Sequence, residues 1–260
     1  MGNKKNVRII RGILLIVIIV CFVQIARVSY LSIKHKKQQE QLSNSLQLEN
    51  TQNDNADSRE NDFSADTGIL RKFEELYAVN SDLAGWLSIE GTEIDYPVVQ
   101  CEDDEYYLHH NFYNEEDKYG CLFMRDYADI NTPGTNVIIY GHSMKDGFMF
   151  GNLDEYESEK FYAEHKLINF DTLYEERVYE IMAVFPSRIY GEEEDVFKYY
   201  QFYQADTEEE FQDFYKNVKR LSLYDTGVTA EFGDTFITLS TCAYHVEDGR
   251  FVVVAKRQIS

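Results

Sequence analysis

Eight short runs of β-branched and aromatic residues, separated by turns, constrain the fold of this chain more than any other feature. Short apolar runs bounded by turn-forming residues are typical of β-strands. A succession of such strands indicates a closed barrel or a β-sandwich. The expected strands lie around residues 86–89, 96–100, 120–124, 136–140, 167–171, 177–185, 235–241 and 251–256.

Two helices are expected beside these strands. The first covers about residues 67–79, where apolar residues recur on one helical face. The second covers residues 207–221, with Asp206 or Thr207 as its N-cap, acidic residues in its first turn and basic residues near its end. Its aromatic residues recur at helical spacing, so we expect them to pack in the core.

An apolar segment over residues 9–28 follows a basic N-terminus over residues 1–8. Its apolar core of about fifteen residues is shorter than the roughly 20 of a comfortable membrane span. Counting from Ile9 and letting Arg11 reach the interface makes spanning feasible. A cleaved signal peptide is the alternative. We favour an uncleaved signal anchor, because residues 26–28 (Ala-Arg-Val) lack the small residues of a cleavage site; basic residues on both flanks leave its orientation open.

Residues 29–66 are rich in Gln, Asn, Ser, Asp and Glu and poor in aromatic residues, which predicts a flexible stalk. Leu42, Leu46 and Leu48 leave a frayed helix as the alternative. The remaining residues, 67–260, are enough for one domain with a sizeable core.

The formal net charge of −21 lies outside the basic N-terminal part of the chain. It excludes nucleic acid as a partner, because the acidic part offers no cationic track for phosphates. The acidic runs at residues 192–195 and 208–210 are expected to be solvated faces, and attraction of a cationic amine acceptor is the alternative reading. Their spacing matches no EF-hand loop, and there is no Gly-rich phosphate loop. We therefore assign no metal and no cofactor.

The last two strand-like runs place a thiol and a permanent cation near each other. Cys242 ends one run, Arg250 begins the next, and the turn-like Glu-Asp-Gly at residues 247–249 separates them. If these strands pair, Cys242 and Arg250 face each other at one end of a sheet. The cation then favours thiolate over thiol and stabilises an oxyanion formed when the thiolate attacks a carbonyl.

His142 is the expected proton-transfer partner, because it follows the strand-like run 136–140 and Gly141. A Cys and a His far apart in sequence are typical of a folded Cys/His site. His245 competes, but it falls in the turn only three residues from Cys242. A structural cysteine is the alternative to a catalytic one. His109, His110 and His165 are expected at the surface, and His35, in the basic cluster after the apolar segment, is given no catalytic role.

Three cysteines follow the apolar segment, and three do not make a disulfide framework. Cys101 and Cys121 are expected as small core or edge residues, with a disulfide between them as the less favoured alternative. Cys242 has to stay reduced to act, so we expect it to be partly shielded.

The motifs around these residues resemble those of the sortases, and class B most closely. They are Thr-Leu-Ser-Thr-Cys at 238–242, Arg-Phe-Val-Val-Val-Ala-Lys at 250–256 and Asn-Val-Ile-Ile-Tyr-Gly-His at 136–142, with further similar stretches at 85–98 and 149–153. The resemblance covers roughly residues 67–258. It implies a mainly β fold, an eight-stranded barrel with an N-terminal helix and a helix inserted before the Cys strand.

The same resemblance implies the site roles. Cys242 is then the nucleophile, His142 the general acid/base and Arg250 the group that steadies substrate and oxyanion. Leu108, Phe197 and Ser240 occupy places that look like the family's peptide groove. The acidic residue that often follows the cysteine in this class is replaced by Ala-Tyr at 243–244, which bears on fine substrate preference.

The implied activity is that of a membrane-anchored cysteine transpeptidase with a cytoplasmic N-terminus over residues 1–8 and an extracellular catalytic domain. It forms a thioester, cuts a C-terminal sorting signal of the Asn-Pro-x-Thr-Asn/Gly kind after Thr, and transfers the surface protein to a peptidoglycan-precursor amine. Its partners are then sorting-signal peptides, the wall amine and, through the N-terminal helix, the membrane. A pilin-polymerising sortase, a hydrolytic cysteine peptidase and a non-catalytic binding module are the alternatives.

Overall fold

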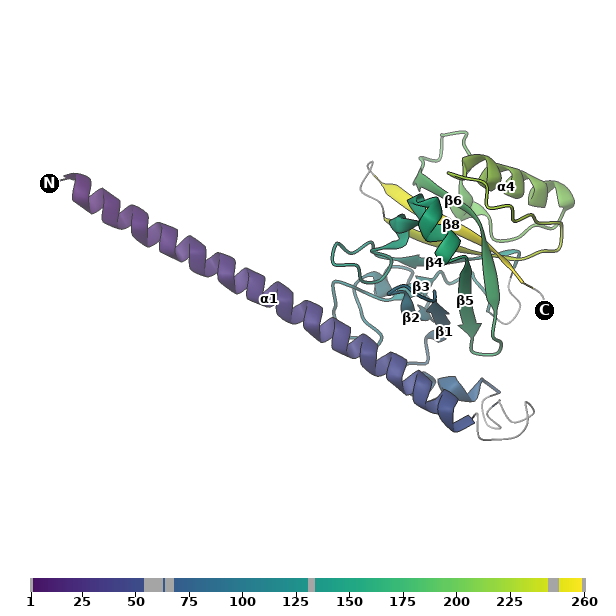
Figure 1. Cartoon of the computed structure of the whole chain (residues 1–260), viewed down its shortest axis with the longest axis horizontal. Helices are drawn as coiled ribbons and strands as arrows, with labels where there is room; N and C mark the ends of the chain where they lie inside the picture. Colours follow the sequence, from purple (N-terminus) through teal and green to yellow (C-terminus); the bar gives the residue numbers. More distant parts are fainter. Residues whose placement is uncertain (1, 54–62, 64–67, 131–133, 243–247, 259–260) are drawn as a thin grey trace. The chain divides into compact units, whose positions relative to one another are not determined.

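The computed structural model of the chain forms two compact units, residues 1–44 and 45–260. It describes residues 2–53, 63, 68–130, 134–242 and 248–258 (Figure 1), and the side chains of residues 2–9, 47–53 and 242 lie outside this description.

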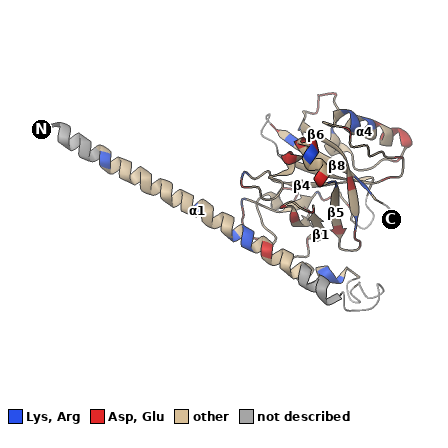
Figure 2. Ribbon diagram, in the orientation of Figure 1, with Lys and Arg blue, Asp and Glu red and all other residues tan. Residues whose placement is uncertain are grey.

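Helix α1 (Gly2–Asn53) contains the apolar segment. Within the described residues, the stretch Ile10–Leu46 is long and apolar enough to cross a membrane, and its most apolar window has a mean hydropathy of 2.5. Figure 2 shows this segment as a long tan stretch of α1 with few charged residues. Because the finding rests on length and composition alone, the signal anchor over residues 9–28 stays a prediction.

The predicted flexible stalk differs from the structure over residues 29–53, which are helical in α1. Neither Gly nor Pro occurs between Gly12 and Asn53, so no residue in this stretch breaks the helical hydrogen-bond ladder. The helical alternative is therefore the better description of residues 29–53. Most of the segment from 54 to 67 lies outside the described residues, and the domain boundaries themselves stay predictions.

Residues 45–260 contain a closed barrel of eight strands in the order β1-β2-β3-β4-β7-β8-β6-β5, with β5 pairing back to β1. The strands are β1 (Leu83–Ser88), β2 (Asp95–Gln100), β3 (Leu122–Met124), β4 (Asn136–Gly141), β5 (Leu167–Thr172), β6 (Val178–Arg188), β7 (Phe236–Cys242) and β8 (Gly249–Arg257). Each overlaps a strand expected from the sequence. The barrel is confirmed, and the sandwich alternative is excluded.

Two of the strand pairs are parallel, β2 with β3 and β4 with β7, and the others are antiparallel. Parallel neighbours end at the same edge of a sheet. The C-terminal ends of β4 and β7 therefore lie side by side, which brings the residues after two distant strands to one end of the barrel.

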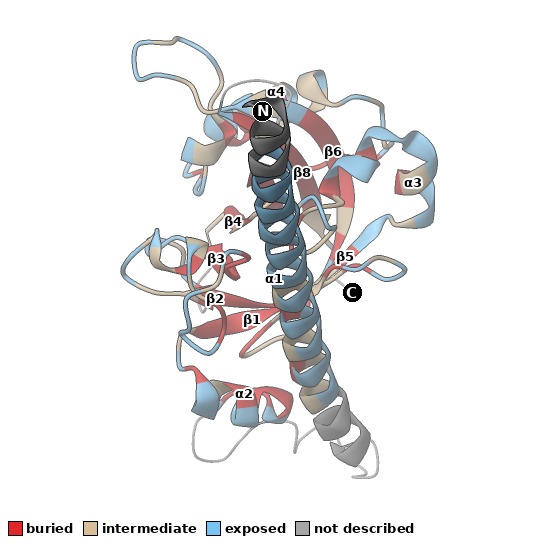
Figure 3. Ribbon diagram, turned by 90° about the vertical axis from the view of Figure 1, so that its left-hand side faces the viewer, coloured by how far each residue is buried: buried red, intermediate tan, exposed pale blue. Residues whose placement is uncertain are grey.

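Strands β6 and β8 are buried on both faces, which explains their nearly continuous apolar sequence. Val252 and Val254 of β8 belong to a core cluster with Phe211 and Phe214 of α4 (Glu208–Leu221). Since side chains alternate along a strand, Val253 faces the other side. Figure 1 shows α4 beside β6 and β8, and Figure 3 shows the strands as the buried part of the domain.

Helix α4 begins where the sequence predicts it. The Thr207 hydroxyl accepts a hydrogen bond from the backbone N–H of Glu210, and the Glu210 carboxylate accepts one from the backbone N–H of Thr207. This reciprocal capping box satisfies two N–H groups that the helix leaves unpaired. The acidic first turn and basic last turn also complement the helix dipole (Figure 2).

The helix predicted from about residue 67 begins later, as a 3₁₀ turn η2 (Arg71–Phe73) followed by α2 (Glu74–Val79). The backbone N–H of Leu70 donates to the Leu173 carbonyl, so this residue is held against the end of β5 instead of entering the helix. The remaining short helices are η3 (Tyr106–Leu108), η4 (Leu153–Glu157), α3 (Glu159–Glu164) and η5 (Tyr199–Gln201).

Candidate active site

The ends of β4, β7 and β8 bring the predicted catalytic positions together. In the parallel pair β4–β7, Tyr140 is the register partner of Ser240, and Gly141 is the partner of Thr241. In the antiparallel pair β7–β8, Cys242 is the register partner of Arg250. The Thr241 hydroxyl donates to the Gly141 carbonyl at 2.8 Å, which ties the two parallel strand ends together.

A cleft of about 310 Å³ opens at these strand ends. Of the six predicted site residues, His142, Arg250, Leu108 and Ser240 line it. The lining is completed by Asp104, Glu105, Phe123, Arg125, Tyr140, Gly141, Ile189 and Tyr200.

His142 is held in the cleft through its ring and its backbone. Its Nε2 lies 2.8 Å from the Leu108 carbonyl oxygen. A carbonyl only accepts, so Nε2 carries the proton in this contact, and the contact orients the ring. The His142 carbonyl accepts from the backbone N–H of Phe150 at 2.9 Å, which folds the following loop back onto the strand end. Leu108, predicted to contact the peptide, thus also positions the imidazole.

Gly141 fits its position because any side chain there meets buried neighbours. A Cβ at this residue lies 2.4 Å from a methyl carbon of Leu122 and 2.8 Å from a ring carbon of Phe150. Both neighbours are fully buried, so they have little room to move.

We expect Gly141→Ala to lower the free energy of unfolding by about 1–3 kcal/mol through overpacking. Urea unfolding followed by the fluorescence of the chain's one tryptophan, Trp86, measures the effect. Gly191→Ala is the matched control, because its Cβ meets only a Glu194 side-chain oxygen at 3.6 Å. Equal stability of the two variants contradicts the packing argument.

Arg250 is half-buried at the start of β8. Its Nη1 donates to the carbonyls of Asp248, at 3.2 Å, and Gly249, at 2.9 Å. These two contacts hold the guanidinium against its own turn and use two of its five N–H donors. Asp248 has a positive φ of 54°, a conformation that Asp tolerates better than most residues.

The floor of the cleft is aromatic, and sequence reasoning did not identify it. Phe123 of β3 and Tyr140 of β4 are register partners with stacked rings whose centroids are 5.6 Å apart. The Arg125 guanidinium lies 5.3 Å from the Tyr140 ring centroid. Burial raises the pKa of Tyr140, so its phenol stays protonated. The sequence did carry a signal for Tyr140. It precedes His142 by two residues, and side chains two apart along a strand lie on the same face.

Phe197 lies apart from this cleft. Its half-buried ring packs 6.0 Å from the Phe214 ring, against the core beneath α4. Ile189 and Tyr200, from the same connection between β6 and α4, line the cleft instead. No periodic pattern marks either residue in the sequence.

The other described histidines of the barrel domain lie outside the lining of the cleft. His109 is exposed, the His110 ring stacks on Tyr106 at 3.9 Å, and His165 contacts the Glu90 carbonyl through Nδ1. The competing base His245 lies outside the described residues, as do residues 243–244 and the Cys242 side chain.

Cys101 and Cys121 are free thiols, which excludes the alternative disulfide between them. Cys121 is buried and Cys101 is half-buried. Burial raises the pKa of each thiol, so both stay protonated and unreactive near neutral pH.

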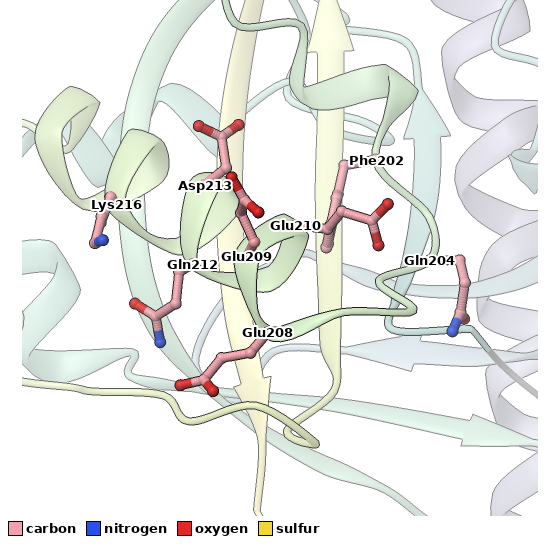
Figure 4. A pocket seen from close by; sticks show the side chains of 8 residues that line it. All are labelled: Phe202, Gln204, Glu208, Glu209, Glu210, Gln212, Asp213 and Lys216. Carbon is pink, nitrogen blue, oxygen red and sulfur yellow. The ribbon is translucent and has the colours of Figure 1, made fainter.

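A larger hollow of about 850 Å³ lies along α4 (Figure 4). Its larger volume favours it as a binding site. However, the described residues that line it include no thiol, imidazole or guanidinium. Four of its residues are carboxylates, and no set of them or of other described residues is arranged to hold a metal ion. The smaller cleft is therefore the candidate active site. The hollow is lined by Phe202, Gln204, Glu208, Glu209, Glu210, Gln212, Asp213 and Lys216.

Comparison with known proteins agrees with this choice of site. A family model described as the sortase domain matches residues 87–258. Sortase B of Listeria monocytogenes is 37% identical over 195 residues, which are 72% of this chain and 74% of that protein.

Solved structures are similar over most of the chain. The Staphylococcus aureus sortase B-substrate complex has a TM-score of 0.74 at 27% identity, covering 86% of this chain and 96% of that one. A sortase B complexed with triglycine has a TM-score of 0.73 at 27% identity, covering 86% and 97%. Because the family match spans more than half of the chain and includes the strand ends around the cleft, this chain belongs to the sortase family, in class B, and is a cysteine transpeptidase.

Proposed function

We propose that the chain cleaves a C-terminal sorting signal through a thioester on Cys242 and transfers the cleaved protein to a cell-wall amine. The Cys242 sulfur attacks the scissile carbonyl, and His142 protonates the departing amine. The acceptor amine then attacks the thioester, His142 takes its proton, and the thiolate leaves. Arg250 stabilises the oxyanion of both steps. No bond change requires a cofactor.

Strand register is the observation that carries this proposal. Gly141 and Thr241 are partners in the parallel pair, and His142 and Cys242 come next along the two strands. Side chains alternate along a strand, so position 242 is on the same face of β7 as Ser240, which lines the cleft. Cys242 is also the register partner of Arg250. These pairings support a nucleophile, a base and a cation that act on one carbonyl.

The two substrates are proposed to be an extended peptide and an amine. A substrate complex is known for the Staphylococcus aureus sortase B, and a triglycine complex for a sortase B. By family resemblance, the peptide carries an Asn-Pro-x-Thr-Asn/Gly-like signal cut after Thr. Leu108 and Ser240 are proposed to contact it. Phe197 stays a prediction, with no support from the lining of the cleft.

Membrane attachment through α1 is part of the proposal. The apolar stretch of α1 supports a single-pass anchor. The outer side for the catalytic domain rests on the family resemblance. Such an anchor holds the enzyme at the surface where sorted proteins and wall precursors meet.

The full-length chain in detergent provides the test, using labelled sorting peptides with and without triglycine or diaminopimelate. We expect a covalent enzyme adduct carrying the N-terminal peptide fragment, and ligated product when the amine is present, both read by mass spectrometry. Cys242→Ala is expected to lose the adduct and the product. Cys101→Ala is the control and is expected to retain both, because Cys101 lies outside the cleft lining.

The outcomes separate the alternatives. Peptide cleavage at the same rate with and without the amine, and without ligated product, identifies a hydrolytic peptidase. Ligation to a lysine of a pilin subunit identifies polymerisation. An adduct that survives Cys242→Ala contradicts the assigned nucleophile. Peptide binding without cleavage by the wild-type chain identifies a binding module.

A further inference from the structure

One wall of the cleft comes from the connection between β6 and α4. Ile189 and Tyr200 of this connection line the cleft. The Tyr200 hydroxyl accepts a hydrogen bond from the backbone N–H of Tyr190 at 3.0 Å and donates to the Tyr190 carbonyl at 3.3 Å. These contacts join the two ends of the wall to each other. The Ile189 end is also held at the turn before β8, because its backbone N–H donates to the Asp248 carbonyl at 3.0 Å. None of these contacts holds the Tyr200 end against the barrel.

A buried hydroxyl pair makes that second connection. The Tyr199 Oη lies 2.7 Å from the Ser240 Oγ, and each residue is only 1% exposed. The Tyr199 ring is packed edge-on against Phe185 at 6.1 Å and Tyr200 at 5.3 Å, which fixes where its hydroxyl points. Removing one hydroxyl leaves its buried partner without this bond, which is costly.

The barrel residue in this pair is close to the chemistry. Ser240 lines the cleft, precedes Cys242 by two residues on the same face of β7, and is the register partner of Tyr140. A shift of the wall at Ser240 therefore changes the space between the bound peptide and the nucleophile position.

The fold of the connection has other supports. The Asn136 side chain donates to the Phe202 carbonyl at 2.9 Å, and the Asn136 backbone N–H donates to the Tyr203 carbonyl at 3.1 Å. The ring of Tyr199 also belongs to the core cluster beneath α4. A variant that removes only the Tyr199 hydroxyl is thus expected to keep the fold.

We propose that Tyr199 is a positioning residue for the peptide substrate. Through Ser240 it sets the distance between the Tyr200 end of the wall and the strand that carries Cys242. It also sets the direction of the Ser240 hydroxyl. This inference rests on the proposed function, because it assumes that the sorting peptide lies in this cleft.

The test is steady-state kinetics of the full-length chain with the sorting peptide at saturating triglycine. Tyr199→Phe is expected to raise KM for the peptide about 3- to 10-fold, the effect of one lost hydrogen bond, with kcat within about twofold of wild type. Ser240→Ala is expected to raise KM by at least this factor, because it removes the same hydroxyl pair and a proposed contact to the peptide. The double variant is expected to have the same KM as Ser240→Ala alone, because the Tyr199 hydroxyl acts only through Ser240.

Tyr224→Phe is the matched control. Its hydroxyl donates to the Tyr156 carbonyl at 2.7 Å, and neither residue lines the cleft, so KM is expected to stay at the wild-type value. Thermal melting of each variant reports on the fold.

Three results overturn the proposal. They are an unchanged KM of Tyr199→Phe at any melting temperature, a fall in kcat alone, and KM effects of the two single variants that multiply in the double variant. If the wild-type chain itself forms no ligated product, the proposed function fails instead, so the two failures are distinguishable.

Discussion

Replacement of His142 by alanine is expected to abolish ligated product between about pH 5 and pH 9, with kcat/KM falling about 10²- to 10⁴-fold. His142 lines the cleft, and its register position is next to that of Cys242. Without the imidazole, no described group in the cleft combines that position with a pKa suited to giving and taking a proton near neutral pH. Initial rates of ligated product across the pH range measure the loss.

A second variant separates proton transfer from positioning. His142→Asn keeps an N–H donor for the Leu108 carbonyl, which His142 contacts at 2.8 Å, but it cannot titrate. It is expected to be as inactive as the alanine variant, whereas His165→Ala, outside the cleft lining, is expected to retain wild-type rates. Wild-type rates for His142→Ala contradict the assignment and make His245 the next candidate.

Arg250→Lys is expected to lower kcat/KM about 10²- to 10³-fold, the loss typical of removing one oxyanion donor. The guanidinium holds the Asp248 and Gly249 carbonyls with one nitrogen and keeps further donors in a rigid fork. A lysine ammonium is a point charge on a flexible stem. It cannot hold the two turn carbonyls and the proposed oxyanion at the same time. The measurement is ligation of a sorting peptide to triglycine under single-turnover and steady-state conditions.

The charge itself has a separate readout. A cation beside Cys242 favours the thiolate, so Arg250→Met is expected to slow iodoacetamide alkylation of Cys242 near neutral pH, while Arg250→Lys is expected to slow it less. Peptide mapping identifies the alkylated cysteine. Arg220→Lys is the control, since Arg220 is exposed on α4 and contacts Asn217. Near-normal ligation by Arg250→Lys contradicts the role given to the fork.

The strands and α4 were predictable because their signals are local. Each strand is a short apolar run between turns, and α4 carries its own capping box at Thr207 and Glu210. The late start of the first helix of the barrel domain was not predictable, because the backbone N–H of Leu70 is drawn to the Leu173 carbonyl, about a hundred residues away. For residues 29–53 the local signal was misleading. Their polar composition predicted a flexible stalk, but they are helical because no Gly or Pro interrupts the helix.

Part of the site was predictable for the same reason. His142 and Arg250 stand where apolar runs end or begin, and the structure brings both into one cleft. Phe197 resembled a groove residue, yet its ring packs toward Phe214. The connection that carries it has no repeating pattern, so nothing in the sequence distinguishes a residue that faces the cleft from one that faces the core.

The sequence by itself determined the number and places of the strands, the cap of α4, the family motifs and the strand-end positions of the candidate catalytic residues. These are properties of neighbouring residues, read from side-chain alternation and helical spacing. Only the tertiary structure decided that the sheet closes through β5 and β1, that Phe123 and Tyr140 form the floor of the cleft, and that Tyr199 meets Ser240. Each of these depends on contacts between residues far apart in the chain, whose approach is set by the packing of the whole domain.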